Sequence, residues 1–201
     1  MTATLLLSGG MDSLSIAWWQ RPPLAITIDY GQIPAPAEIE AASAICEELK
    51  IDHSIIRVDC RSLGSGDMAG EESSPHAPAS DWWPYRNQLL ITLAAARALE
   101  KGADKLLLGT VASDASHRDG TLEFVQSINQ LMRMQEGGLA VEAPAIHLSA
   151  SELVRTAQVP LSLLAWAHSC HRSDVACGAC RGCNKYFNTF RELGHALDRS
   201  G

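Results

Sequence analysis

The sequence lacks three features that would take the chain out of the class of cytoplasmic globular proteins. Its apolar runs are all shorter than the roughly 20 residues that a membrane-spanning helix needs. The segment after Met1 has neither the basic region nor the cleavage site of a secretory signal. An excess of positive charge is also missing, since the formal net charge is −7, and this argues against a broad nucleic-acid surface. We therefore expect a cytoplasmic protein that binds no membrane and no nucleic acid.

Cysteine is scarce outside one short stretch. Of the six cysteines, Cys46 and Cys60 stand alone, and the other four fall between residues 170 and 183. In a cytoplasmic chain such a cluster indicates a metal site rather than a set of disulfides. Disulfide bonds are not needed for stability, because a chain of 201 residues can bury a core of its own.

The hydrophobic pattern alternates between short apolar runs and segments with helical spacing. Strands are predicted over residues 4–7, 24–29, 53–59, 105–109 and 142–146, and helices over residues 13–20, 36–50, 87–101, 121–134, 149–157 and 183–193. This order is typical of an α/β fold, a doubly wound parallel sheet of about five strands with helices on both faces. We expect residues 1–160 to form this Rossmann-like domain and residues 161–201 to form a metal-binding segment packed on it.

Ligands of such sheets bind beyond the carboxyl ends of the strands. The loops expected at those ends are residues 8–13, 29–33, 61–86 and 110–120. Residues 61–86 are rich in Gly, Ser, Pro and Ala, so we expect this long loop to be a flexible lid over the site.

The first predicted strand runs directly into the hexapeptide Ser8-Gly9-Gly10-Met11-Asp12-Ser13. Two glycines let the backbone turn tightly, and the helix that follows presents free N–H groups and the positive end of its dipole. Together with two hydroxyl groups this geometry suits a phosphate, with the carboxylate available for an accompanying Mg²⁺. The simpler interpretation is a glycine turn in which Asp12 or Ser13 caps the helix.

The pattern Ser-Gly-Gly-x-Asp-Ser resembles the pyrophosphate loop of the adenylate-forming ATP pyrophosphatases. It differs from the Walker loop, which needs a Gly-Lys pair that this chain lacks. The resemblance implies that ATP is cleaved between its α- and β-phosphates after an oxygen of the substrate attacks the α-phosphate.

The cysteine cluster has the spacing Cys170-x6-Cys177-x2-Cys180-x2-Cys183. Four thiolates at such spacing suit a tetrahedral Zn²⁺, and because four protein ligands close the coordination shell, the metal would be structural. An iron–sulfur cluster is the rival occupant.

The pyrophosphate loop and the four-cysteine end together resemble the 7-cyano-7-deazaguanine synthase (QueC) family, and the resemblance extends over nearly the whole chain. The matching segments are IDYGQ at residues 28–32, PYRN at 84–87, LGTVASDAS at 108–116, Glu123-Phe124, and HSC with CGACRGC at residues 168–183. The family implies a ligase that takes 7-carboxy-7-deazaguanine, ATP and ammonia. The carboxylate is adenylated, ammonia converts it to the amide, and a second activation gives the nitrile.

The resemblance also implies residue roles. The residues implied at the ATP and Mg²⁺ site are Leu7, Ser8, Gly9, Gly10, Met11, Asp12, Ser13, Asp29, Tyr30, Gly31, Gln32, Arg86 and Asn87. Catalytic roles are implied for Ser8, Asp12, Ser13, Arg86 and Asp114. Arg86 would neutralise a phosphate or the substrate carboxylate, unless it is a surface residue. Asp114 would accept hydrogen bonds from the base, unless it caps a helix or turn.

Three departures from the family pattern affect the substrate side. Ile33 and Pro34 replace an Arg-His pair, residues 117–122 replace a Gly-Tyr-Pro-Asp-Cys-Arg loop, and His168 replaces a Trp. The pair Trp82-Trp83 in the lid either anchors that loop or offers a stacking surface for a ligand or partner.

These departures leave several functions open. The first is the nitrile-forming synthase, and the second is a QueC-like paralogue that passes the activated acid to an amine of a protein partner, as proposed for antiviral gene clusters. A nucleotide-binding protein without turnover and a tRNA-thiolating enzyme are two more candidates, the last disfavoured by the short, acidic chain. The family implies a homodimer, for which Met132, Met134 and the last helix are candidate contacts.

Overall fold

Five parallel strands form a single sheet in the computed structural model, which describes residues 2–195. Their order across the sheet is β3-β2-β1-β4-β5. The strands are β1 Ala3–Leu6, β2 Leu24–Asp29, β3 Asp52–Arg57, β4 Lys105–Leu107 and β5 Ala140–Glu142. The order reverses direction between β1 and β4, which is the switch point where doubly wound sheets bind their ligands. The predicted fold class is confirmed.

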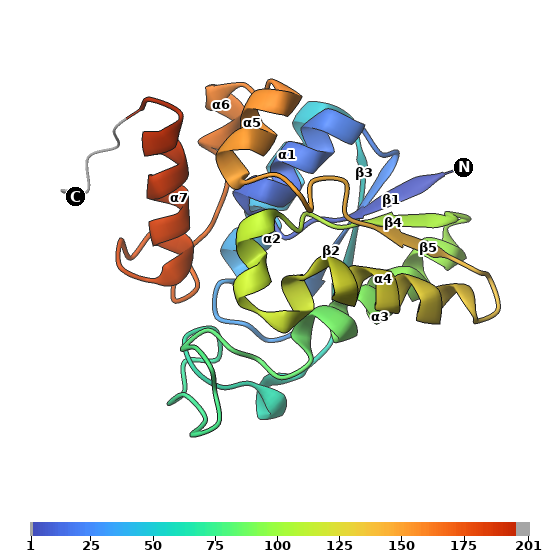
Figure 1. The fold of residues 1–201 in the computed structure, drawn as a ribbon, viewed down its shortest axis with the longest axis horizontal. Helices are drawn as coiled ribbons and strands as arrows, with labels where there is room; N and C mark the ends of the chain where they lie inside the picture. The colour runs from blue at the N-terminus through green and yellow to red at the C-terminus, as the bar shows by residue number, and fades with distance from the viewer. Residues whose placement is uncertain (1, 196–201) are drawn as a thin grey trace.

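Helices cover both faces of the sheet (Figure 1). One face carries α1 Met11–Gln20, α2 Ala35–Leu49, α5 Ala150–Ala157 and α6 Leu161–Leu164. The other face carries α3 Arg86–Glu100 and α4 Leu122–Arg133. The last helix, α7 Arg181–Glu192, packs beside α5. Leu163 and Leu164 of α6 are buried in the same core as α1. The domain boundary expected at residue 160 stays a prediction.

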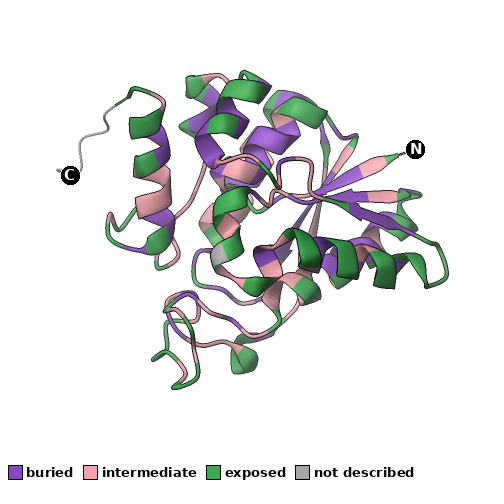
Figure 2. Ribbon diagram, in the orientation of Figure 1, coloured by how far each residue is buried: buried purple, intermediate pink, exposed green. Residues whose placement is uncertain are grey.

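Side chains that alternate along the strands divide the interior into two cores. Leu5 and Leu7 point into the α1/α2/α5 core, whereas Ile26 and Ile28 point into the α3/α4 core. Such alternation follows from the two-residue repeat of a strand, and strands covered on both faces are apolar at nearly every position. Figure 2 shows the buried strands between helices whose outer surfaces are exposed. Among the described residues, no helix is long and apolar enough to cross a membrane.

The fifth strand lies earlier in the chain than predicted. It comprises Ala140–Glu142, paired with β4, and not residues 142–146. Pro144 has no N–H to donate to a neighbouring strand, and the Ile146 N–H donates to the Ala143 carbonyl at 3.2 Å in a turn. The predicted strand 53–59 also ends earlier, at Arg57.

Three segments that are distant in sequence gather beyond the carboxyl ends of the strands. They are the lid loop (residues 61–85), the β4–α4 loop (residues 108–121) and the cysteine segment (residues 168–183). Short 3-10 turns shape the first two, at Arg61–Leu63, Ala112–Ser116 and Arg118–Gly120. In Figure 1 the lid loop and α7 lie on the side of the sheet away from the N-terminus.

The turn from β1 into α1 depends on Gly9. Its φ is +75°, and a Cβ at this position would lie 2.5 Å from the Glu38 carbonyl oxygen of α2. Gly102, which follows α3, has the same φ of +75° and no atom within 4 Å of a Cβ. The two glycines therefore separate the cost of a left-handed backbone from the cost of a steric clash.

We expect Gly9→Ala to destabilise the protein clearly more than Gly102→Ala. The backbone term of about 1–2 kcal/mol is common to both, and the clash with α2 adds about 1–3 kcal/mol at Gly9 alone. Urea unfolding of the two variants measures the difference. Equal losses of unfolding free energy would contradict the tight packing of this turn against α2.

Candidate active site

A cleft with a volume of about 320 Å³ opens beyond the carboxyl ends of β1 and β4. The β1–α1 turn, the start of α3, the lid loop, the β4–α4 loop, the cysteine segment and α7 all contribute to its walls. A volume of this size is typical of a small-molecule site. Polar side chains converge on the cleft from every one of these elements.

The turn at residues 8–13 is held by its own two serines. Ser13 Oγ donates to the Gly10 carbonyl at 3.0 Å and accepts from the Ser8 N–H at 3.3 Å. The Ser8 and Ser13 hydroxyl oxygens are 3.1 Å apart. These bonds keep the turn closed and leave Ser8, Gly10 and Ser13 on the wall of the cleft.

The start of α1 faces the cleft without a cap. No side chain of the described residues accepts a hydrogen bond from its first turn, so neither Asp12 nor Ser13 has the capping role of the simpler interpretation. Free N–H groups and the positive end of the helix dipole are thereby available to an anion. Because this arrangement suits an anion such as a phosphate, we name residues 8–13 the phosphate-binding turn.

Asp12 lies in this first turn and has one oxygen to spare. Its Oδ2 is 2.6 Å from Lys185 Nζ, whereas its buried Oδ1 has no hydrogen-bond partner among the described residues. Burial raises the pKa of this carboxyl, Lys185 opposes the shift and Asp114 adds to it. A buried carboxylate oxygen without a donor is a fitting ligand for a hard cation such as Mg²⁺.

Lys185 of α7 bridges two carboxylates that are distant from it in the sequence. Its Nζ lies 2.6 Å from Asp12 Oδ2 and 2.8 Å from Asp114 Oδ1. Burial alone would lower the pKa of Lys185, but the two carboxylates raise it. The cleft therefore holds a fixed positive charge next to the phosphate-binding turn.

Asp114 is fully engaged by protein groups. Its Oδ1 pairs with Lys185, and its Oδ2 accepts from the Val111 N–H at 3.1 Å. The sequence suggested either a base or a local cap as the partner of this residue, and the structure places it between a turn and Lys185.

The segment after β2 folds back on itself. Buried Gln32 accepts from the Tyr30 N–H at 2.9 Å through Oε1, and its Nε2 donates to Glu38 Oε2 at 2.7 Å. Asp29 Oδ1 accepts from the Gly31 N–H at 3.1 Å. Of the predicted residues 29–32, Tyr30 alone is on the cleft wall, and Glu38 joins it there.

Arg86 begins α3 and points into the cleft under the lid loop. Its Nη1 is 2.9 Å from Met68 Sδ of the lid. Burial alone would lower the pKa of Arg86, but neighbouring groups, led by Tyr30 and Asp119, raise it above its usual value. Asn87 Nδ2 donates to the Asp119 carbonyl at 3.3 Å. A surface role for Arg86 is not supported.

The lid loop is anchored by Trp83. This side chain is 3% exposed and packs edge-on against Tyr30, with ring centroids 4.9 Å apart. Of the Trp82-Trp83 pair, Trp83 is therefore the residue that anchors the lid loop, whereas Trp82 is half-buried.

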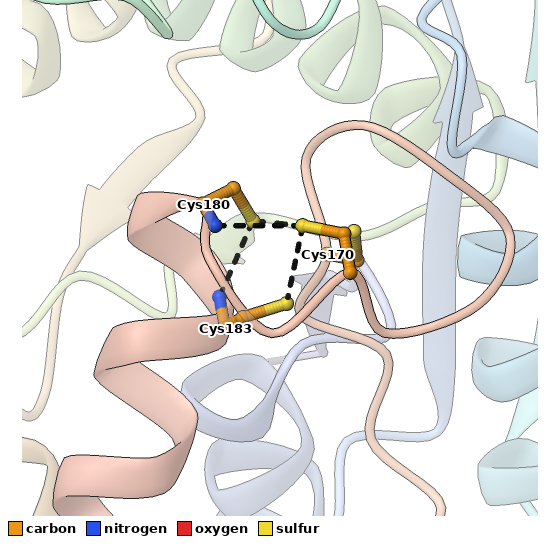
Figure 3. Close-up of side chains that lie close together, drawn as sticks. Cys170, Cys180 and Cys183 are labelled. Carbon is orange, nitrogen blue, oxygen red and sulfur yellow. Dashed lines mark hydrogen bonds between the residues drawn. The ribbon is translucent and has the colours of Figure 1, made fainter. Parts of the chain in front are cut away.

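The four cysteines of the cluster converge as the spacing predicted, and Figure 3 shows Cys170, Cys180 and Cys183 close together. All four Sγ atoms lie within 4.8 Å of one another. The pairs Cys170–Cys180 and Cys177–Cys183 are each 3.9 Å apart, close to the edge of about 3.8 Å for a tetrahedral zinc–thiolate site. Backbone N–H groups point at the sulfur atoms and lower the pKa of Cys177 to about 6. The donor set and its geometry fit a metal ion.

Sequence reasoning missed several side chains on the cleft wall, among them Glu38, Asp81 and Lys185. Glu38 is one turn into a helix, Asp81 is in a loop without periodicity, and Lys185 follows the last cysteine of the cluster. An acidic residue near a helix start is a weak sequence signal for Glu38. No local sequence pattern indicated Asp81 or Lys185. Gly9, Asp29, Gly31 and Gln32 were predicted at the ATP site but are not on the wall.

A family model described as "Queuosine biosynthesis protein QueC" matches residues 2–194 of the chain. Three relatives named 7-cyano-7-deazaguanine synthase show the level of similarity. The relative from Nautilia profundicola is 29% identical over 96% of this chain and 94% of its own length. Those from Desulforudis audaxviator and Novosphingobium aromaticivorans are 31% and 34% identical over 96% of this chain, and over 98% and 91% of their own lengths.

Two solved structures share the fold at low sequence identity. The U34-tRNA thiolase NcsA from Methanococcus maripaludis has a TM-score of 0.53 at 16% identity. The match covers 95% of this chain and 65% of the thiolase chain. The NMN synthetase from Francisella tularensis has a TM-score of 0.52 at 16% identity and covers 98% of this chain and 79% of its own.

Metal analysis tests the cysteine cluster. We expect about one thiolate-bound metal ion per chain in purified protein, and loss of that ion together with a lower Tm in Cys180→Ser. Cys60→Ala, which removes a buried cysteine outside the cluster, is the matched control and should keep the metal. Wild-type protein that carries no metal and binds none when Zn²⁺ is added would refute the assignment.

The pH dependence of stability tests the environment of Glu38. Burial raises the pKa of this carboxyl from its usual 4.5 to about 7, against a hydrogen bond from Gln32 and the charge of Arg86. The folded protein then holds a proton that the unfolded chain releases, so the contribution of Glu38 to stability falls as the pH rises through this range.

We expect Glu38→Gln to flatten the decrease in unfolding free energy between pH 4.5 and pH 7, as measured by urea unfolding at a series of pH values. Glu40→Gln, on the exposed side of the same helix, serves as control. Parallel pH profiles of wild type and Glu38→Gln would contradict the shift.

Proposed function

Because the chain belongs to the QueC family of queuosine biosynthesis proteins, we propose that it is an ATP-dependent ligase that activates the carboxylate of 7-carboxy-7-deazaguanine and joins it to ammonia. The first product is the amide, and a second activation gives the nitrile, 7-cyano-7-deazaguanine. Relatives that carry the synthase name match nearly the whole chain, which supports this reaction over tRNA thiolation and over nucleotide binding without turnover.

One observation carries the proposal: the fixed positive charge of Lys185 next to an uncapped helix start. Lys185 contacts Asp12 at 2.6 Å, and Asp12 belongs to the first turn of α1. A site of free N–H groups, a cation and one spare carboxylate oxygen suits a leaving pyrophosphate with its Mg²⁺. An oxygen of the substrate then attacks the α-phosphate, and the P–O bond to pyrophosphate breaks.

The chemistry needs positioning and charge neutralisation rather than a covalent nucleophile. A carboxylate is a poor electrophile, and the acyl adenylate makes its carbon reactive toward ammonia. Ammonia adds, AMP leaves with the former carboxylate oxygen, and a proton is lost. Adenylation of the amide oxygen and loss of a second AMP then give the nitrile. Arg86, half-buried under the lid, would neutralise the charge of the carboxylate or the α-phosphate.

Zinc is the metal that best suits the cysteine cluster. Four thiolate ligands leave no open position, so the ion would stabilise the fold and take no part in the reaction. Thiolate ligands also need a reducing compartment, which favours the cytoplasm. An iron–sulfur cluster is the second candidate, and metal analysis separates the two.

A protein amine in place of ammonia is the second candidate function. It is favoured by Ile33, which is 40% exposed where the family carries a basic residue, and whose N–H donates to the Met68 carbonyl of the lid loop at 2.9 Å. An apolar side chain next to the lid suits a larger acceptor better than it suits ammonia.

Thiolation of tRNA has less support. The two cysteines outside the cluster, Cys46 and Cys60, are buried and do not line the cleft.

The homodimer stays a prediction. Met134, one of its proposed contacts, is 77% exposed, whereas Met132 is 9% exposed and packs in the α3/α4 core.

Incubation with ATP, ammonia and 7-carboxy-7-deazaguanine, followed by mass spectrometry, tests the reaction. We expect AMP, the amide and the nitrile. Asp12→Asn and Lys185→Met should lower kcat/KM by about 10²-fold or more, because each removes charge at the pyrophosphate end of the site.

Lys105→Met is the matched control for the loss of a lysine, since Lys105 pairs with Glu142 at 2.9 Å in the sheet, and it should keep near-normal activity. Amide or a protein adduct without nitrile would favour the second candidate. Absence of AMP with every acceptor would leave a nucleotide-binding protein without turnover.

A further inference from the structure

Asp81 is a buried carboxylate at the inner surface of the lid loop. The residue is 6% exposed and forms part of the cleft wall. Its Oδ1 has no hydrogen-bond partner among the described residues. Since burial of a carboxylate oxygen without a donor is costly, such an oxygen in a ligand cleft indicates a donor that arrives with the ligand.

Three side chains that can carry positive charge surround Asp81 at distances beyond hydrogen bonding. Arg181 Nη1 and His117 Nε2 lie 3.6 and 3.7 Å from Oδ1, and His171 Nδ1 lies 3.5 Å from Oδ2. They come from α7, the β4–α4 loop and the cysteine segment. Arg181 supplies a permanent positive charge beside the carboxylate, while the distances leave Oδ1 without a hydrogen bond.

The cleft wall has four other acidic side chains with different commitments, and one of them, Asp119, raises the pKa of Arg86. Both oxygens of Asp114 are engaged by Lys185 and by the Val111 N–H. Asp12 belongs to the phosphate-binding turn and pairs with Lys185. Glu38 accepts a hydrogen bond from Gln32 at 2.7 Å. Of these carboxylates, Asp81 is the one on the lid loop, and it has a buried oxygen without a hydrogen bond.

We infer that Asp81 recognises the ring of the substrate by accepting hydrogen bonds from adjacent N–H donors. This inference rests on the proposed function, because 7-carboxy-7-deazaguanine presents such a pair, the ring N1–H and the 2-amino group. A carboxylate accepts both in a two-point contact, which is stronger than a contact between neutral groups. Arg181 or His117, adjacent to the same carboxylate, would donate to the neighbouring ring carbonyl.

Because Asp81 is on the lid loop, its contact with the base would also affect which bases the site selects. A base with both donors holds the lid loop to the β4–α4 loop and the cysteine segment. A base without the 2-amino group leaves the buried oxygen unpaired, and sites built around such a hydrogen bond reject the incomplete ligand strongly.

A pair of ligands and a pair of variants test this role. Isothermal titration calorimetry would compare 7-carboxy-7-deazaguanine with the analogue that lacks only the 2-amino group. We expect the wild-type protein to bind the complete base at least about 10-fold more tightly, given the strength of hydrogen bonds to charged groups. In Asp81→Asn this ratio should fall to about threefold or less, with ATP affinity within about twofold of wild type.

Asp67→Asn is the matched control, because Asp67 also joins the lid to the cysteine segment, through Arg172 at 2.7 Å. This variant should keep the discrimination between the two bases even where it weakens both affinities. A wild-type ratio that persists in Asp81→Asn, or equal wild-type affinities for the two bases, would overturn the inference while leaving the proposed function standing. Wild-type protein that binds ATP but neither base would refute the proposed function itself.

Discussion

The contact of Lys185 with Asp12 and Asp114 is the interaction on which the cleft depends. It joins α7 to the first turn of α1 and to the β4–α4 loop, with separations of 2.6 and 2.8 Å. The three side chains are partly shielded from water, so each charge is stabilised by the others more than it would be at a fully exposed surface. The ion pairs therefore close the cleft on one side and fix the charge that a pyrophosphate would meet.

The cysteine cluster determines where Lys185 lies. Cys180 caps α7, since its side chain accepts from the Cys183 N–H, and Lys185 follows within the next two turns of the same helix. The segment before the cluster is tied to the phosphate-binding turn, because the His168 N–H donates to the Gly9 carbonyl at 3.0 Å. A metal bound by the four thiolates would thus organise catalytic charge at a distance without contact with the substrate.

Local sequence signals sufficed for the features that depend on local chemistry. The run Leu24–Asp29 is a strand at its predicted bounds, and the Ser-Gly-Gly turn and the four cysteines have the geometry that their spacing predicts. The sequence was insufficient where contacts are long-range. Nothing in the helical pattern around Lys185 shows that it meets Asp12, and nothing in the lid loop shows that Asp81 is buried. The bounds of the short fifth strand depended on its pairing with β4, which no local pattern reveals.

The central claim is that the substrate carboxylate attacks the α-phosphate of ATP, and an isotope experiment tests it directly. With 7-carboxy-7-deazaguanine labelled with ¹⁸O in its carboxylate, one labelled oxygen should appear in AMP after ammonia displaces it, and the pyrophosphate should stay unlabelled. Label in inorganic phosphate together with formation of ADP would place the attack on the γ-phosphate and would contradict the account.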